Sequence, residues 1–374
     1  MSASAVNDPY QNIRPYHDNE VGDVLNRLIR DDELISAITR YQFPRTASAF
    51  GWLLKPMVRI FLAQKTDDIE SVQDFQNLVA GYMSKMIARS TTKLSCTGYE
   101  NLDPDEAYLF VSNHRDIAMD PAFVNWVMYQ NKLDTLRIAI GDNLLRKPYV
   151  SDLMRLNKSF IVNRSAKGRA VLTALGQLSS YIDHSLVHDE ASIWIAQREG
   201  RAKDGNDVTD PAILKMFYMA HRKQRSFEEF LERVKIVPVS ISYEFDPCDR
   251  AKALELAAKR QDGNYEKSQF EDIESIVAGI TGEKGHVHVA FGDVITGIDN
   301  PDELAVEIDR QIINNYYLHP SNLIAAGVDS AEISDADRQA FESRVEGLDA
   351  TAAEILQQMY ANPVLNKNRQ QEAA

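Results

Sequence analysis

The chain has 374 residues, which is long for one compact domain and favours two units or one enlarged unit. Its composition, 44% hydrophobic and 26% charged, excludes collagen-like, low-complexity and broadly disordered classes. The formal charge of −14 argues against a surface that binds nucleic acid, so any anion site has to be local. The two cysteines, Cys96 and Cys248, are too few for a disulfide framework or a cysteine-built zinc site and fit a reducing compartment.

The first 20 residues contain no apolar run that could form the core of a signal peptide, so we expect a cytoplasmic protein. The most apolar window, residues 50–62, is shorter than the roughly 20 residues that span a bilayer. It also contains Lys55 and Arg59, so we do not expect it to cross a membrane.

The first 91 residues are predicted to form a helical N-terminal domain. Three segments, 21–40, 47–64 and 69–88, have apolar residues at spacings of three and four, which is typical of amphipathic helices.

The pattern changes at Thr92, where short β-branched and aromatic runs begin to alternate with amphipathic stretches. This alternation predicts an α/β domain over residues 92–300, with a largely parallel mixed sheet flanked by helices. A helical C-terminal extension is expected over residues 301–374, with a long helix over 329–359 and a frayed end from Asn366. The predicted strands are 108–112, 136–140, 159–162, 192–196, 235–242 and 286–291, and the predicted helices between them are 121–130, 168–187 and 211–223.

A candidate base, His114, follows the first of these strands, at the edge where open α/β sheets bind their ligands. Asp120 and Pro121 are typical of a helix start, with Asp120 as N-cap and Pro121 as first helical residue. Because Pro121 disfavours a helical conformation at Asp120, we expect residues 115–120 to form a loop that brings a carboxylate to the imidazole. Asp116 is also close in sequence, so either carboxylate could be the partner.

Two further loops after strands are basic. Residues 197–205 hold two arginines and a lysine within six residues, flanked by glycines, which predicts a local cationic pocket in an acidic protein. Arg164 follows another strand and could bind a phosphate or carboxylate through two hydrogen bonds. Each loop by itself is more typical of solvated surface than of a binding site.

Taken together and in order, these segments resemble the glycerolipid acyltransferases, specifically the glycerol-3-phosphate acyltransferase branch, over about residues 95–245. Four blocks carry the resemblance: Asn113-His114 with Asp120-Pro121-Ala122; residues 141–144 with Pro148 and Phe160–Arg164; Glu199-Gly200-Arg201; and Ile236–Tyr243.

Two spacings depart from the family pattern. Five residues separate His114 from Asp120 where the family has four, and no residue separates Gly200 from Arg201 where the family has one. We favour Asp120 over Asp116 because the Asp-Pro-Ala that follows is similar to the soluble plastid type.

The resemblance implies direct transfer of a fatty acyl group from acyl-CoA or acyl carrier protein to glycerol 3-phosphate, in phospholipid biosynthesis. His114 would be the general base, oriented by Asp120. The acceptor phosphate would lie among the basic residues of the two loops, and no cofactor or metal is expected beyond the acyl thioester co-substrate. The implied substrate-binding residues are Arg164, Glu199, Gly200, Arg201 and Lys203.

Because the product is a lipid, residues 49–62 are a candidate for peripheral contact with the inner membrane face, with Lys55 and Arg59 toward headgroups. Packing of this apolar face as core is the slightly favoured alternative. Three other functions stay open: an acyltransferase that uses lysophosphatidate as acceptor, a thioesterase, and a non-catalytic lipid-binding homologue. The acyl chain length and the oligomeric state are also open.

Overall fold

The structure, a computed structural model, describes residues 8–263, 271–331 and 333–373. The start of the chain, for which we expect no signal peptide, is therefore described only from residue 8, and Ala374 lies outside these ranges. The chain forms two compact units, which we call unit 1 (residues 1–82 and 137–174) and unit 2 (residues 83–136 and 175–374). The division expected at residues 91 and 300 stays a prediction.

Unit 1 combines the N-terminal helices with a short pair of strands. Its elements are α1 (Asp18–Arg30), α2 (Asp32–Gln42), α3 (Ala47–Thr66), the first part of α4 (Val72–Ser90), β3 (Arg137–Gly141), the 3-10 helix η2 (Asp142–Leu144), α6 (Pro148–Leu156), β4 (Ser159–Val162) and the start of α7 (Arg169–Val187). β3 and β4 pair in parallel. The apolar stripe of α1, with Val21, Leu25 and Leu28, is buried against Phe75 and Leu156, as its spacing predicts.

The single helix predicted over residues 21–40 is two helices. They meet at Asp31, whose backbone is extended and whose side chain accepts a hydrogen bond from the amide of Leu34 at 2.8 Å. Aspartate is a favoured N-cap because its carboxylate satisfies an amide that a helix start leaves unpaired. The prediction of one continuous helix is therefore wrong.

The apolar side chains of α3 are largely exposed. Trp52, Met57 and Ile60 expose 76%, 57% and 60% of their surface, whereas Val58 is buried. Trp52, Met57 and Ile60 are therefore not part of the core of unit 1, and the alternative that this helix packs under the α/β domain stays a prediction. Within the described ranges, no helix combines the length and the apolarity that crossing a membrane requires.

Unit 2 contains five strands in the order β1-β7-β6-β2-β5. Their bounds are β1 (Lys93–Thr97), β2 (Leu109–Ser112), β5 (Ile193–Ala196), β6 (Ile236–Tyr243) and β7 (His286–Phe291). β2 is parallel to both β5 and β6, and β1 is parallel to β7, whereas β6 and β7 are antiparallel. The predicted fold class, a largely parallel mixed sheet, is confirmed. β1 was not predicted because Lys93-Leu-Ser-Cys-Thr97 lacks an apolar run.

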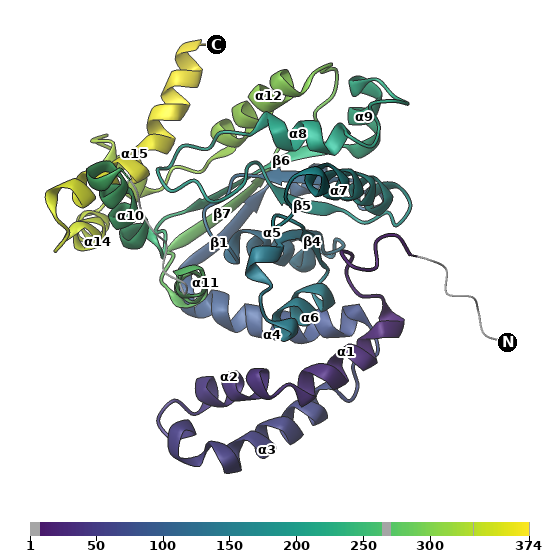
Figure 1. Ribbon diagram of the computed structural model, residues 1–374. Helices are drawn as coiled ribbons and strands as arrows, with labels where there is room; N and C mark the ends of the chain where they lie inside the picture. Colours follow the sequence, from purple (N-terminus) through teal and green to yellow (C-terminus); the bar gives the residue numbers. More distant parts are fainter. Residues whose placement is uncertain (1–7, 264–270, 332, 374) are drawn as a thin grey trace. The chain divides into compact units, whose positions relative to one another are not determined.

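Helices cover both faces of these strands, with α5 on one face and α12 on the other (Figure 1). The remaining elements of unit 2 are η1 (Tyr99–Asn101), α5 (Met119–Gln130), α8 (Pro211–Tyr218), α9 (Phe227–Val234), α10 (Asp249–Asp262), α11 (Glu271–Thr281), α12 (Pro301–Asn315), α13 (Pro320–Ala325), α14 (Asp335–Val345) and α15 (Ala350–Ala373). α9, α10 and α11 were not among the predicted helices.

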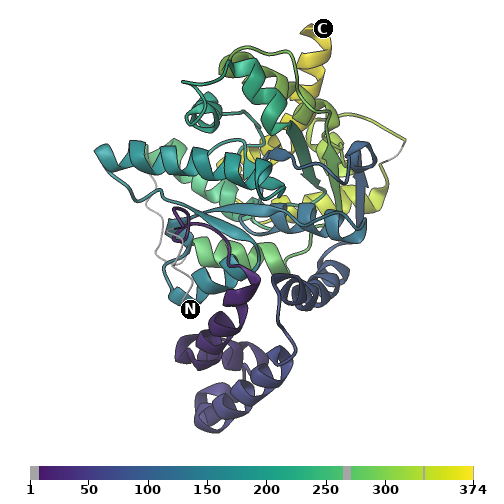
Figure 2. The ribbon, with the colours of Figure 1, turned by 90° about the vertical axis from the view of Figure 1, so that its right-hand side faces the viewer.

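The C-terminal helices differ from the prediction in two ways. The helix expected over residues 329–359 is divided, because α14 ends at Val345 and α15 begins at Ala350. The end expected to fray from Asn366 is helical to Ala373, and α15 contacts α12 (Figure 2). Burial of Val364 and a hydrogen bond of 2.8 Å from Lys367 Nζ to the Asn314 carbonyl hold this polar end.

Candidate active site

His114 lies directly beyond the carboxyl end of β2, in unit 2. Its neighbour Asn113 is fully buried and extends the pairing with β6 by side chain: Nδ2 donates to the Ile241 carbonyl at 3.0 Å, and Oδ1 accepts from the Ile241 amide at 2.8 Å. These two hydrogen bonds hold the backbone at the residue before His114, and so they fix the position from which the His114 side chain extends. The sequence identified Asn113 only as part of a block, not as this anchor.

His114 is paired with Asp120. Its Nδ1 lies 2.8 Å from Asp120 Oδ2, and the side chain is 15% exposed whereas that of Asp120 is fully buried. In the neutral form of the ring, a carboxylate at Nδ1 favours the proton on that nitrogen and leaves Nε2 as the acceptor. A buried carboxylate holding one nitrogen of a partly accessible imidazole is the arrangement of a general base.

Asp120 is not the N-cap of the helix. α5 begins at Met119, so Asp120 and Pro121 both lie within its first turn. Proline is tolerated there because the first amides of a helix have no intrahelical acceptor. The expected loop over residues 115–120 is thus shorter, and the helix itself carries the carboxylate to the imidazole.

The N-cap position of α5 is occupied by Ala118, and Asp116, two residues earlier, accepts from the first amides of the helix. Its Oδ1 accepts from the amides of Ala118 and Met119 at 2.9 and 2.8 Å. Burial raises the pKa of Asp116, and the charge of Asp120 raises it further. Of the two carboxylates that the sequence left open, the structure therefore places Asp120, not Asp116, against His114.

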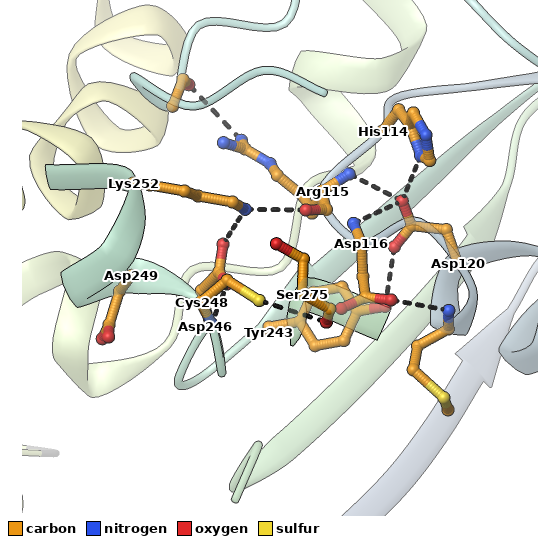
Figure 3. A network of polar contacts seen from close by, with 12 residues as sticks. His114, Arg115, Asp116, Asp120, Tyr243, Asp246, Cys248, Asp249, Lys252 and Ser275 are labelled. Carbon is orange, nitrogen blue, oxygen red and sulfur yellow. Dashed lines mark hydrogen bonds and ion pairs between the residues drawn. The ribbon is translucent and has the colours of Figure 1, made fainter. Parts of the chain in front are cut away.

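The Asp120 carboxylate is fully occupied by donors (Figure 3). Oδ2 also accepts from the amides of Arg115 and Asp116 at 2.6 and 2.9 Å, while Oδ1 accepts from the hydroxyl of Tyr243 at 2.6 Å. Tyr243 ends β6 and was quoted only as the last residue of a block. The signal that could have identified Tyr243 is a hydroxyl at the end of a buried strand, because a buried hydroxyl needs a hydrogen-bond partner.

Buried ion pairs surround this centre. The Arg115 guanidinium donates to Asp207 at 2.6 Å. Lys252 Nζ donates to the Arg115 carbonyl at 2.7 Å and to the Asp246 carboxylate (Figure 3). The nearby carboxylates, Asp207 first, hold the pKa of Arg115 above its ordinary value against its burial. These partners come from distant segments, and no local pattern in the sequence predicted them.

The segment that follows Glu199-Gly200-Arg201 contacts the His114 loop through its backbone. The amide of Ala202 donates to the carbonyl of His114 at 2.9 Å, which places Arg201 beside the His114 loop. Arg201 NH1 is buried and has no hydrogen-bond partner within the described part of the chain. Gly200 has a φ of +78°, a conformation that favours glycine.

The other expected binding residues are placed differently. Lys203 is paired with Glu255 of α10, and Glu199 is exposed. Arg164 belongs to unit 1, where it is exposed after β4; its amide and that of Ser165 donate to the Asp142 carboxylate at 3.1 and 3.2 Å.

No group of three or more metal-ligating side chains occurs among the residues that the structure describes. Two histidines of β7, His286 and His288, instead share the hydroxyl of Ser95, at 2.6 Å from His286 Nε2 and 2.7 Å from His288 Nδ1. Burial is the main cause of a lowered pKa at His288, about 4. The His288 ring is therefore neutral near pH 7, and burial also lowers the pKa of His286.

One comparison with known protein families agrees with the resemblance over part of the chain. Residues 93–242 match the model of the acyltransferase family. A crystal structure of the 1-acyl-sn-glycerophosphate (LPA) acyltransferase PlsC from Thermotoga maritima aligns with 76% of this chain and 94% of its own, at 15% sequence identity and a TM-score of 0.41. No curated protein matches the chain.

Proposed function

We propose, from the match of residues 93–242 to the model of the acyltransferase family and from the geometry of the candidate site, that the protein transfers a fatty acyl group from a thioester to a hydroxyl of glycerol 3-phosphate. The donor is acyl-CoA or acyl carrier protein, and the product is 1-acylglycerol 3-phosphate. One observation carries the proposal: the 2.8 Å pair of His114 Nδ1 with the fully buried carboxylate of Asp120. The choice of glycerol 3-phosphate rests on the sequence blocks.

In this reaction His114 Nε2 removes the proton of the acceptor hydroxyl as its oxygen attacks the thioester carbonyl. Asp120 holds the other ring nitrogen and stabilises the imidazolium that forms. The carbon–sulfur bond then breaks, and the imidazolium returns the proton to the thiolate that leaves. No serine or cysteine nucleophile takes part, so there is no acyl-enzyme.

The acceptor phosphate is held by Arg201, whose buried and unpaired NH1 is a free donor beside the His114 loop. Glu199 and Gly200 stay predicted substrate-binding residues. Arg164, which belongs to unit 1, also stays a predicted binding residue. Lys203 contributes less, because Glu255 already pairs its ammonium group. Fixing the phosphate sets which hydroxyl faces His114, and such orientation supplies a large part of the rate.

Peripheral contact with a lipid surface is part of the proposal. α3 exposes Trp52, Leu53, Met57, Ile60 and Phe61, each by half of its surface or nearly so. Large exposed apolar side chains on one helix suit insertion at the boundary between headgroups and acyl chains. Such contact suits the proposed reaction, because the acyl chain of the donor and of the product is apolar.

The test incubates the purified protein with labelled acyl-CoA and either glycerol 3-phosphate or lysophosphatidate. We expect labelled ester with glycerol 3-phosphate and its loss in His114→Ala. His184→Ala is the matched control, since His184 lies on α7 with 40% of its side chain exposed. Ester with neither acceptor, or undiminished ester in His114→Ala, contradicts the proposal. Ester with lysophosphatidate alone would move the acceptor to the second candidate, and acceptor-independent release of fatty acid would indicate a thioesterase.

A further inference from the structure

Tyr243 contacts the carboxylate of the candidate catalytic pair from a buried position. It is the last residue of β6 and is 4% exposed, and its hydroxyl donates a hydrogen bond of 2.6 Å to Asp120 Oδ1. The other three donors to Asp120, including His114, all reach Oδ2. Within the described ranges Tyr243 is therefore the hydrogen-bond donor that holds the second oxygen of this buried carboxylate.

The phenol is kept neutral and fixed in place. Burial raises the pKa of Tyr243 well above its ordinary value, and the negative charges of Asp120, Asp116 and Asp246 raise it further. Its ring meets Phe123 of α5 edge to face, with the ring centroids 5.9 Å apart. Tyr243 thus remains a hydrogen-bond donor over the whole working range of pH.

We propose that Tyr243 is a positioning residue that orients the Asp120 carboxylate and lowers the proton affinity of the His114–Asp120 pair. This inference rests on the proposed function, in which His114 has to be neutral to accept a proton. A hydroxyl donated to a buried carboxylate spreads its negative charge. Without that donor, the bare oxygen attracts the proton of the pair more strongly, so the imidazole stays protonated to higher pH.

The experiment compares Tyr243→Phe with Tyr360→Phe. Tyr360 is a matched control, because its buried hydroxyl also donates to a carboxylate, Asp249 Oδ2 at 2.8 Å, and burial likewise raises its pKa well above the ordinary value. Two readouts are measured: the pH profile of kcat/KM with glycerol 3-phosphate, and the titration of the His114 imidazole by NMR in the free protein.

In Tyr243→Phe we expect kcat to fall about tenfold with KM little changed, as for one lost charge-assisted hydrogen bond. We also expect the acidic limb of the profile and the NMR midpoint to move to higher pH by about half to one unit. Tyr360→Phe should lower thermal stability but should move neither the acidic limb of the pH profile nor the NMR midpoint of His114. An unmoved midpoint in Tyr243→Phe, or the same shift in both variants, overturns the inference.

Two features keep the test decisive. The NMR midpoint does not depend on turnover, so a protein that transfers no acyl group would refute the proposed function and still report on Tyr243. If Tyr243→Phe does not fold, site-specific replacement of Tyr243 by 3-fluorotyrosine keeps the shape and strengthens the donor. The midpoint should then move to lower pH, and a shift to higher pH or no shift overturns the inference.

Discussion

The exchange of each candidate carboxylate for its amide tests the assignment of Asp120. In Asp120→Asn the amide oxygen can take the place of Oδ2 and accept from His114 and the two backbone amides, while the amide nitrogen donates to the Tyr243 hydroxyl. The fold is therefore kept, but the negative charge that stabilises the imidazolium is lost. The corresponding change in hydrolytic triads costs about 10⁴-fold in kcat, or about 5 kcal/mol of transition-state stabilisation.

Asp116→Asn is the matched control four residues away. Its amide oxygen can replace Oδ1 and accept from Ala118 and Met119, since asparagine caps helices as well as aspartate does. Asp116 Oδ2 is buried without a hydrogen-bond partner in the described part of the chain, so removing the charge costs little. We expect kcat within about threefold of the unmodified protein, measured as ester formation at saturating acceptor. A larger loss in Asp116→Asn than in Asp120→Asn would refute the reasoning.

Three further predictions use other parts of the structure. Arg201→Ala should raise the KM for the acceptor about 10- to 100-fold with little effect on the KM for the donor, whereas Lys203→Ala, which breaks the pair with Glu255, should lower the melting temperature and raise the acceptor KM much less. A rise in the donor KM alone in Arg201→Ala would assign Arg201 to the coenzyme phosphates. Trp52→Ser should weaken sedimentation with anionic vesicles about tenfold, whereas Leu172→Ser, which removes an apolar side chain 63% exposed on α7, should not; equal losses would show that α3 has no special part. Below pH 6.5 the unfolded chain binds a proton at His288 that the folded protein, with a pKa of about 4 there, does not. The free energy of unfolding in urea should therefore fall as pH decreases from about 6.5 to 4, by up to about 1.4 kcal/mol per pH unit for this residue. In His288→Asn the free energy should depend less on pH. The same pH dependence in the variant and the unmodified protein would contradict the prediction.

The regular elements could be predicted where the pattern is local. The strands β2, β4, β5 and β7 lie within a residue of their predicted bounds, because β-branched and aromatic runs mark them. The break at Asp31 and the start of α9 after Ser226 carry capping signals that spacing alone does not detect.

The site was predictable only in its local part. His114 and Asp120 are six positions apart, so a helix start can bring them together, and the extra residue relative to the family is absorbed because Asp120 lies in the first turn of α5. Tyr243 is 123 positions from Asp120, and its contact depends on the register between β2 and β6. A single sequence contains no signal for that register.

The hydrogen bond from the Ala202 amide to the His114 carbonyl has a consequence for regiochemistry. It ties the residue after Arg201 to His114, so one backbone contact links the residue proposed to bind the phosphate to the residue proposed as the base. In the proposed reaction this contact sets the distance between Arg201 and the His114 imidazole. An acceptor whose phosphate binds Arg201 then presents to the imidazole only the carbon that lies at that distance. Selection between the two free hydroxyls of glycerol 3-phosphate then depends on backbone spacing more than on contacts to the hydroxyls themselves.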